Sequence, residues 1–249
     1  MDILETHAYD RRQRRNTSCL LFLSLFPFFL SAALYFYWWI PLSEPSLLAA
    51  AVKSAPTFSL ALLVLSYNGG RSLVGVAGGL FFSVGGDCCL IWDELFLAGM
   101  ACFAVTHVLY SVSFLSSHYS SHSSSSLSFF FYLLLWLTGG GTYAYLFPHL
   151  QKSHDSSILT PAVGVYVLLL VLMVTLALRT RQPLMALGSL SFIVSDFTLA
   201  IQHFKVVPNL EHGRLFVMTT YYLSQLLIAV GDVRAGTDEA AEFHKWKRS

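Results

Sequence analysis

Two aspartates stand inside long apolar stretches of this sequence. Asp87 follows Gly-Leu-Phe-Phe-Ser-Val-Gly-Gly, and Asp196 follows Gly-Ser-Leu-Ser-Phe-Ile-Val-Ser. An ionisable side chain at the centre of a membrane helix costs about 2.5 kcal/mol or more on insertion scales, and function is the usual reason for keeping one. Two such carboxyl groups can take different roles in acid–base chemistry, one acting as an acid while the other stays ionised. The structural alternative is that each is paired in helix packing, for example Asp87 with Lys53.

Further polar side chains in apolar stretches are candidates for lining a cavity near the aspartates. His107 and Tyr110 are three residues apart and therefore lie on one face of a helix. A lone histidine on an apolar face is more often a hydrogen-bonded core residue, so interhelical bonding is the competing interpretation. We predict that the substrate-binding residues are Lys53, His107, Tyr110, Tyr221, Tyr222 and Gln225.

No metal or other cofactor is expected. An Asp-Asp-His site would use groups at similar depth, but neither the H-x3-H nor the H-E-x-x-H spacing is present to support it. The four cysteines fall in or beside apolar runs without a C-x-x-C spacing, which indicates buried thiols and no disulfide framework.

The composition is that of a membrane protein. The 249 residues are 55% hydrophobic and only 12% charged, and the mean hydropathy is +0.60. Soluble domains carry about 25% charged residues, so a water-soluble fold is disfavoured. A net charge of +1 argues against nucleic-acid binding. We expect membrane lipid around the chain, and a homodimer is left open.

The apolar runs predict eight membrane-spanning helices. The runs are continuous and lack the period-two alternation of barrel strands, and only helices or closed barrels span a bilayer. We therefore predict an all-α integral membrane protein, with a basic segment at 1–19, an eight-helix catalytic domain at 20–232 and a polar tail at 233–249. The expected spans are 20–40, 46–66, 71–91, 95–115, 127–147, 160–180, 183–204 and 214–232.

The distribution of Lys and Arg predicts that both termini are cytosolic. Eight crossings place the termini on one side, and most basic residues fall on that side, whereas Lys152, Lys205 and Arg214 fall on the other. The positive-inside rule supports this orientation. The final residues Lys-Trp-Lys-Arg-Ser also match the K-x-K-x-x pattern of cytosolic retrieval signals, so we expect the endoplasmic reticulum membrane.

A weak internal echo relates the two aspartates. Shifting the sequence by 109 positions pairs Gly79 with Gly188 and Asp87 with Asp196, together with three similar residues between and after them. This would place the first four spans on the last four as a 4+4 parallel repeat. The competing interpretation is chance similarity between glycine-rich helices. At 1.5 Å per residue, both aspartates lie about 20 to 24 Å from the cytosolic ends of their spans.

These residues together resemble a known family. In order and spacing they are similar to the YhhN-like lysoplasmalogenase membrane proteins, over about residues 20–232, and Ala-Val-Thr-His-Val-Leu-Tyr is similar to the animal members. The motifs that carry the resemblance are Lys53-Ser-Ala-Pro56, Gly86-Asp87-x-x-Leu90, His107-x-x-Tyr110, Ser195-Asp196-x-x-Leu199 and Tyr221-Tyr222-x-x-Gln225.

The resemblance implies an ether hydrolase. Its substrate would be lysoplasmalogen, whose vinyl ether bond is cleaved to a fatty aldehyde and glycerophosphoethanolamine or glycerophosphocholine, with Asp87 and Asp196 as the catalytic residues. Paired intramembrane carboxylates also describe proton-coupled transporters, and a lipid-binding or inactive relative is a further alternative. We expect the two carboxyl groups to face one cavity within about 10 Å of each other, as in other paired-carboxylate hydrolases.

Overall fold

In the computed structural model, the described residues form helices joined by short turns, with no strand among them. These are residues 19–41, 45–116, 126–153, 155–180, 182–207 and 212–246, with the backbone alone described for 126–128 and 238–246. The helices are α2 (Phe26–Trp38), α3 (Leu47–Asn68), α4 (Val76–Cys89), α5 (Phe96–Leu115), α6 (Ser126–Leu150), α7 (Ser156–Arg179), α8 (Pro183–His203) and α9 (Gly213–Trp246), with short 3-10 segments η1 (Gly69–Val74) and η2 (Asp93–Leu95).

These eight α-helices confirm the predicted all-α architecture. Residues 19–24 are also helical and lead into α2, so that Cys19–Trp38 is long and apolar enough to cross a membrane. Seven such segments are present in the described chain, and α4 is shorter. Its 14 residues span about 21 Å, against a hydrocarbon core of about 30 Å, because η1 and Gly75 interrupt the predicted third span.

Local sequence signals explain several helix ends. The side chain of Ser46 caps α3 by accepting a hydrogen bond from the Ala49 amide at 3.1 Å. Pro183 occupies the first turn of α8, where its fixed φ suits a helix start. Pro56 lies inside α3 and removes one backbone donor in the turn that also carries Lys53 and Thr57.

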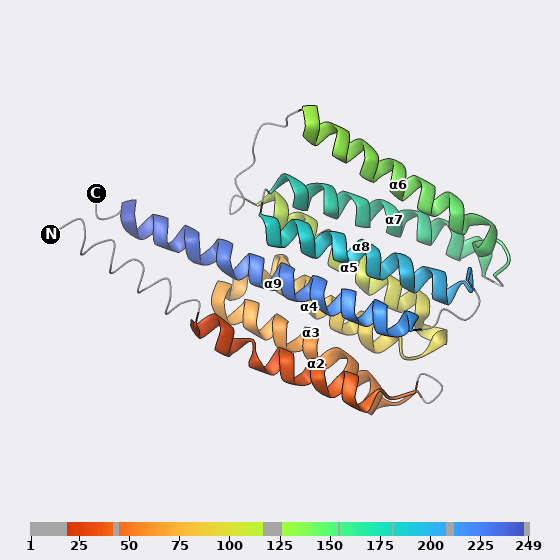
Figure 1. Cartoon of the computed structure of the whole chain (residues 1–249), viewed down its shortest axis with the longest axis horizontal. Coiled ribbons are helices and arrows are strands. Elements are labelled where there is room, and N and C mark those ends of the chain that lie inside the picture. Colours follow the sequence, from red (N-terminus) through yellow and green to blue (C-terminus); the bar gives the residue numbers. More distant parts are fainter. Residues whose placement is uncertain are drawn as a thin grey trace.

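Six helices form a closed ring, and two lie outside it. Around the ring the contacts run α3–α4–α5–α7–α8–α9 and back to α3, whereas α2 packs on α3 and α6 packs on α7. Figure 1 shows α2 and α6 at opposite edges of the bundle. The start of α2 and the end of α9 lie at the same end of the bundle, as an even number of crossings requires (Figure 1).

The 4+4 repeat stays a prediction, and the contacts between consecutive helices can be compared between the two halves. Each helix contact of the first half has a counterpart in the second: α2–α3 with α6–α7, α3–α4 with α7–α8, and α4–α5 with α8–α9. The paired glycines share a role as well. A Cβ on Gly79 would clash with the Tyr110 ring of α5, and one on Gly188 would lie 2.8 Å from Ile228 of α9. Each of the paired glycines thus allows a close approach to a neighbouring helix.

The predicted start of the C-terminal tail falls inside α9. The last helix continues to Trp246, and Val233 and Ala235 are buried, so the predicted tail begins as part of α9. The first 18 residues, most of the serine-rich loop and the final three residues lie outside the described chain.

Candidate active site

The Asp87 carboxylate lies in a sealed cluster of hydroxyl groups. Its Oδ2 accepts hydrogen bonds from Thr57 of α3 at 3.1 Å and from Tyr221 of α9 at 2.8 Å. The Thr57 and Tyr221 hydroxyls are themselves 3.3 Å apart. Asp87 is 1% exposed. Lys53, which the sequence suggested as a packing partner, is buried on α3, while the two hydroxyls supply the hydrogen bonds to Asp87.

A second buried network fixes the helices around this cluster. Tyr110 donates to Gln225 Oε1 at 2.6 Å, and Gln225 Nε2 donates to Ser83 at 3.0 Å. Thr106 lies 3.1 Å from Ser83 and donates to the Gly79 carbonyl. Because buried polar groups are stable only when they are paired, this network ties α4, α5 and α9 into one arrangement. Tyr110 and Gln225, predicted to bind substrate, thus contact each other.

Lys53 and Tyr222 also lie together. The Tyr222 hydroxyl donates to the Lys53 backbone carbonyl at 2.7 Å, and Tyr222 packs edge-on against Tyr35 of α2. Arg214 donates to the Tyr35 hydroxyl and to the Ile40 carbonyl, which joins the start of α9 to the end of α2. These contacts hold α2 beside α3 and α9, the helices that supply Thr57 and Tyr221 to the Asp87 cluster.

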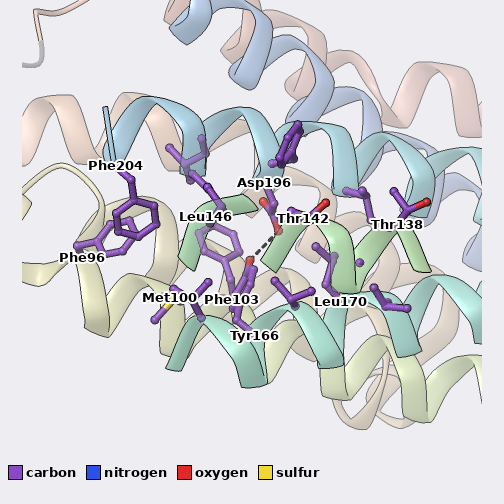
Figure 2. Close-up of a pocket in the computed structure, with 18 of the residues that line it drawn as sticks. Phe96, Met100, Phe103, Thr138, Thr142, Leu146, Tyr166, Leu170, Asp196 and Phe204 are labelled. Atoms are coloured by element: carbon purple, nitrogen blue, oxygen red, sulfur yellow. Dashed lines mark hydrogen bonds between the residues drawn. The ribbon is translucent and has the colours of Figure 1, made fainter. Parts of the chain in front are cut away.

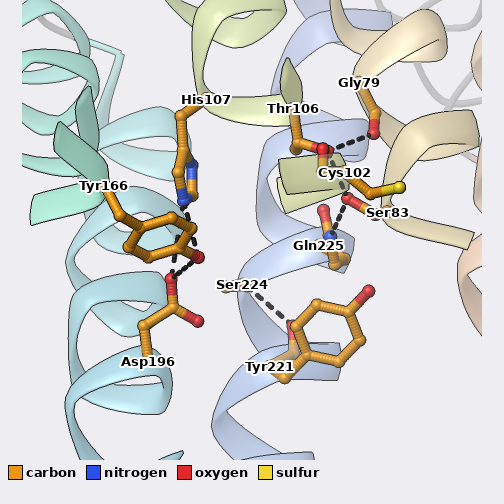
Figure 3. Close-up of polar contacts among 10 residues, drawn as sticks. All are labelled: Gly79, Ser83, Cys102, Thr106, His107, Tyr166, Asp196, Tyr221, Ser224 and Gln225. Carbon is orange, nitrogen blue, oxygen red and sulfur yellow. Dashed lines mark hydrogen bonds and ion pairs between the residues drawn. The ribbon is translucent and has the colours of Figure 1, made fainter. Parts of the chain in front are cut away.

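Asp196 lies in a different cluster (Figure 3). Tyr166 of α7 donates to Asp196 Oδ2 at 2.6 Å, and His107 Nε2 lies 3.1 Å from the Tyr166 hydroxyl and 3.5 Å from the same Oδ2. The geometry fits a chain in which His107 Nε2–H donates to Tyr166 and Tyr166 donates to Asp196. His107 Nδ1 is then the unprotonated nitrogen, consistent with its being buried without a partner in the described chain. The other carboxylate oxygen of Asp196 stays available.

A cavity reaches Asp196 from the side of α6. It encloses about 850 Å³, counting its open mouth, and lies between α5, α6, α7 and α8. The walls are apolar apart from Asp196, Tyr166, Thr138 and Thr142. Figure 2 shows Asp196 and Tyr166 hydrogen-bonded to each other among aromatic and aliphatic side chains. Asp196 is 11% exposed, and its carboxyl group can meet an occupant of the cavity.

Among the predicted site residues, Asp196 is the one that lines this cavity. Two aromatic rings, those of Phe103 and Phe192, lie between the two clusters. Tyr221, which binds Asp87, packs edge-on against Phe103 and Phe192 with ring centroids 5.8 Å apart in each case, and Phe192 packs on His107 at 5.0 Å. Phe103 lines the cavity. The expected single cavity shared by Asp87 and Asp196 is therefore not formed in this structure.

Tyr166 is the functional residue that the sequence analysis missed. A single tyrosine in Val-Gly-Val-Tyr-Val-Leu-Leu-Leu looks like an ordinary membrane-helix residue. The signal lies in the spacing of the proposed repeat. Thr57 precedes Asp87 by 30 residues, Tyr166 precedes Asp196 by 30, and each hydroxyl donates to its aspartate. The offset of 109 residues that pairs the two aspartates therefore also pairs Thr57 with Tyr166.

The described residues contain no group of three His, Cys, Asp or Glu side chains placed to hold a metal ion. What the two clusters offer is acid–base chemistry: a carboxyl group beside an apolar cavity, held by a tyrosine and a histidine, and a second carboxyl group behind a wall of rings. A bundle of apolar helices with such groups in its interior defines a multi-pass membrane protein with an intramembrane polar site.

Comparison with known proteins gives the family. Residues 48–231 match the YhhN family, and the chain belongs to that family. Curated relatives include lysoplasmalogenase TMEM86A of Bos taurus, 35% identical over 85% of this chain and 89% of the relative. Lysoplasmalogenase TMEM86B of Sus scrofa is 37% identical over 83% and 84%, and the Homo sapiens TMEM86B is 36% identical over 85% and 87%. No solved structure matches the chain.

Proposed function

We propose that this protein is a lysoplasmalogenase, an ether hydrolase that cleaves the vinyl ether of a lysoplasmalogen inside the membrane. The observation that supports it most directly is Asp196, whose carboxyl group faces an apolar cavity while Tyr166 and His107 hold one of its oxygens. The curated relatives are named lysoplasmalogenases. The mainly apolar walls of the cavity suit a hydrocarbon chain.

In the proposed mechanism Asp196 is the acid. Its carboxyl proton passes to the outer alkene carbon, and the ether oxygen stabilises the resulting cation as an oxocarbenium ion. The Asp196 carboxylate then lies beside that cation and takes a proton from the water that attacks it. The hemiacetal formed in this way breaks its carbon–oxygen bond to give a fatty aldehyde and the glycerophospho-alcohol. One water is consumed, and Asp196 ends protonated as it began.

Asp87 is the second carboxylate of the proposed pair. It lies behind Phe103 and Tyr221, so contact with the same substrate requires those rings to move. The alternative is that Asp87 acts from its present position through its charge. In both cases, removing the carboxylate should lower activity without removing the cavity.

The test is aldehyde release by purified protein in detergent, with and without a chelator. Asp196→Asn should lower the rate about 100-fold or more, the usual size of an acid–base contribution, and Asp87→Asn should lower it as well. Asp232→Asn is the matched control, because Asp232 is a buried carboxylate bonded to Asn68 at the far end of α3. Full activity of both folded aspartate variants would refute the carboxylate mechanism.

The competing function is a proton-coupled carrier. No proton gradient exists in detergent. An enzyme still releases aldehyde from the lysolipid under these conditions, whereas a carrier does not. We further propose that the protein resides in the endoplasmic reticulum membrane with both termini cytosolic, on the basis of its C-terminal Lys-Trp-Lys-Arg-Ser and its loop charges. A glycan attached to the acceptor sequence at Asn16 would contradict that orientation.

A further inference from the structure

The cavity has chemically different ends. Toward the middle of α6 and α7 its lining includes Leu135, Thr138 and Val171, with no charged side chain. Toward the end of α8 the lining includes Phe96 and Phe204. Phe96 is stacked on His203 with ring centroids 3.5 Å apart. A lysolipid in this cavity cannot place a zwitterionic head group at the apolar end, because a charge left there would lose its hydration.

Charged side chains gather at the second end. Asp93 lies three residues before Phe96, and Lys205 directly follows Phe204, the two residues that line this end of the cavity. Asp93 begins η2 just before α5, and Lys205 follows the last turn of α8 with a positive φ of 50°. We call Asp93, His203 and Lys205 the head-group rim. The negative charge of Asp93 is favourable at the start of a helix, and the positive charge of Lys205 is favourable at the end of one. Helix stabilisation is therefore an alternative role for these residues, which the test has to distinguish from lipid binding.

The distances match the lipid. His203 is seven residues beyond Asp196 on α8, about 10 Å along the helix. In a lysoplasmalogen, six bonds separate the vinyl ether carbon from phosphorus, a fully extended reach of about 7.5 Å. A vinyl ether beside Asp196 therefore brings the phosphate to within about 3 Å of the level of His203, and the amine of the head group lies slightly farther out.

We propose that the lysolipid binds with its head group at this rim and its hydrocarbon chain toward Leu135 and Val171, with Lys205 holding the phosphate and Asp93 the head-group amine. This inference rests on the proposed function. With cytosolic termini, the end of α8 faces the non-cytosolic side. The enzyme would then take lysolipid from the non-cytosolic leaflet and release the water-soluble product on that side, while the aldehyde stays in the bilayer.

A photolabelling experiment tests the orientation without relying on turnover. The probe is a saturated 1-alkyl glycerophosphoethanolamine, which has no vinyl ether to cleave, with a diazirine at the end of its alkyl chain. The expected result is labelling of peptides that contain Leu135 or Val171. Labelling at Phe96 or Phe204, or no labelling of cavity residues, overturns the proposal.

Competition then tests the rim. The phosphoethanolamine lipid without a diazirine should compete about five-fold more weakly for Lys205→Gln than for the parent protein, the scale of one exposed ion pair. A 1-alkylglycerol, which lacks the head group, should compete equally for both. Lys152→Gln is the matched control, because Lys152 is an exposed lysine in the turn after α6, outside the cavity lining. Equal weakening for both lipids, or none, overturns the role of Lys205.

The two failures are distinguishable. If the parent protein shows the expected labelling but releases no aldehyde from lysoplasmalogen, the proposed hydrolysis is wrong while the binding orientation stands. If it releases aldehyde but is labelled at the Phe96 and Phe204 end, the function stands and the orientation is wrong.

Discussion

Replacing Tyr166 by phenylalanine removes the hydroxyl group that holds the proposed acid, Asp196, and leaves the cavity intact. The lost hydroxyl donates to Asp196 Oδ2 at 2.6 Å, the shorter of the two polar contacts of that oxygen, while His107 Nε2 stays at 3.5 Å. The hydrogen bond strengthens as Asp196 gives up its proton, because hydrogen bonds to charged acceptors are about twice as strong as neutral ones. Tyr166 therefore stabilises the transition state more than the bound substrate.

The expected size follows from that contact. A hydrogen bond to a charged group contributes about 1.5 to 3 kcal/mol, and each 1.36 kcal/mol changes a rate tenfold. The bound substrate complex already has this bond to the neutral acid at about half that strength, so only the difference of about 0.75 to 1.5 kcal/mol acts on kcat. Tyr166→Phe should thus lower kcat for aldehyde release about 4- to 12-fold. KM should change little, since binding by the apolar walls is untouched.

The assay is aldehyde release against lysoplasmalogen concentration, with folding checked by thermal unfolding in detergent. Tyr143→Phe is the matched control, because Tyr143 belongs to α6 and donates to the Thr160 carbonyl of α7 at 3.2 Å, away from Asp196. The reasoning fails if Tyr166→Phe keeps its kcat, or if Tyr143→Phe loses as much.

Two further predictions concern packing and access. Gly188→Ala should lower the unfolding temperature by several degrees, because the new Cβ would lie 2.8 Å from Ile228 Cγ1 and 3.0 Å from the Ser224 carbonyl, and overpacking costs about 1 to 3 kcal/mol. Gly140→Ala has no atom within 4 Å of its Cβ and gains helix propensity, so its unfolding temperature should hold or rise; a fall equal to that of Gly188→Ala would contradict this. Ala200→Phe adds a ring to the cavity wall between Asp196 and Phe204 and should raise KM with the unfolding temperature retained, whereas an unchanged KM would show that substrate does not pass there.

The sequence was sufficient to predict the helices because hydropathy and bilayer thickness set their length. It failed locally where backbone geometry intervened. The third span is divided into η1 and the short α4 at Gly75, and the last helix runs past its predicted end because Val233 and Ala235 are buried in the bundle. Neither effect depends on hydropathy alone.

The candidate site was predictable in its carboxylates and less so in their surroundings. An aspartate in an apolar run is conspicuous, but its neighbours depend on how helices distant in sequence meet. His107 and Tyr110 share a helix, yet one binds Tyr166 near Asp196 and the other binds Gln225 near Ser83. The rings of Phe103 and Phe192 that separate the two clusters look like ordinary membrane residues in the sequence.

Each carboxylate cluster is completed by a helix from the opposite half of the chain. Asp87, in the first four helices, takes a hydrogen bond from Tyr221 of α9, and Asp196, in the last four, has His107 of α5 beside it. A half expressed alone would therefore carry an acidic group with one of its neighbours missing. Two fragments divided between Ser116 and Ser126 should work only after they reassociate, as do subunits of a symmetric dimer that share a site at their interface.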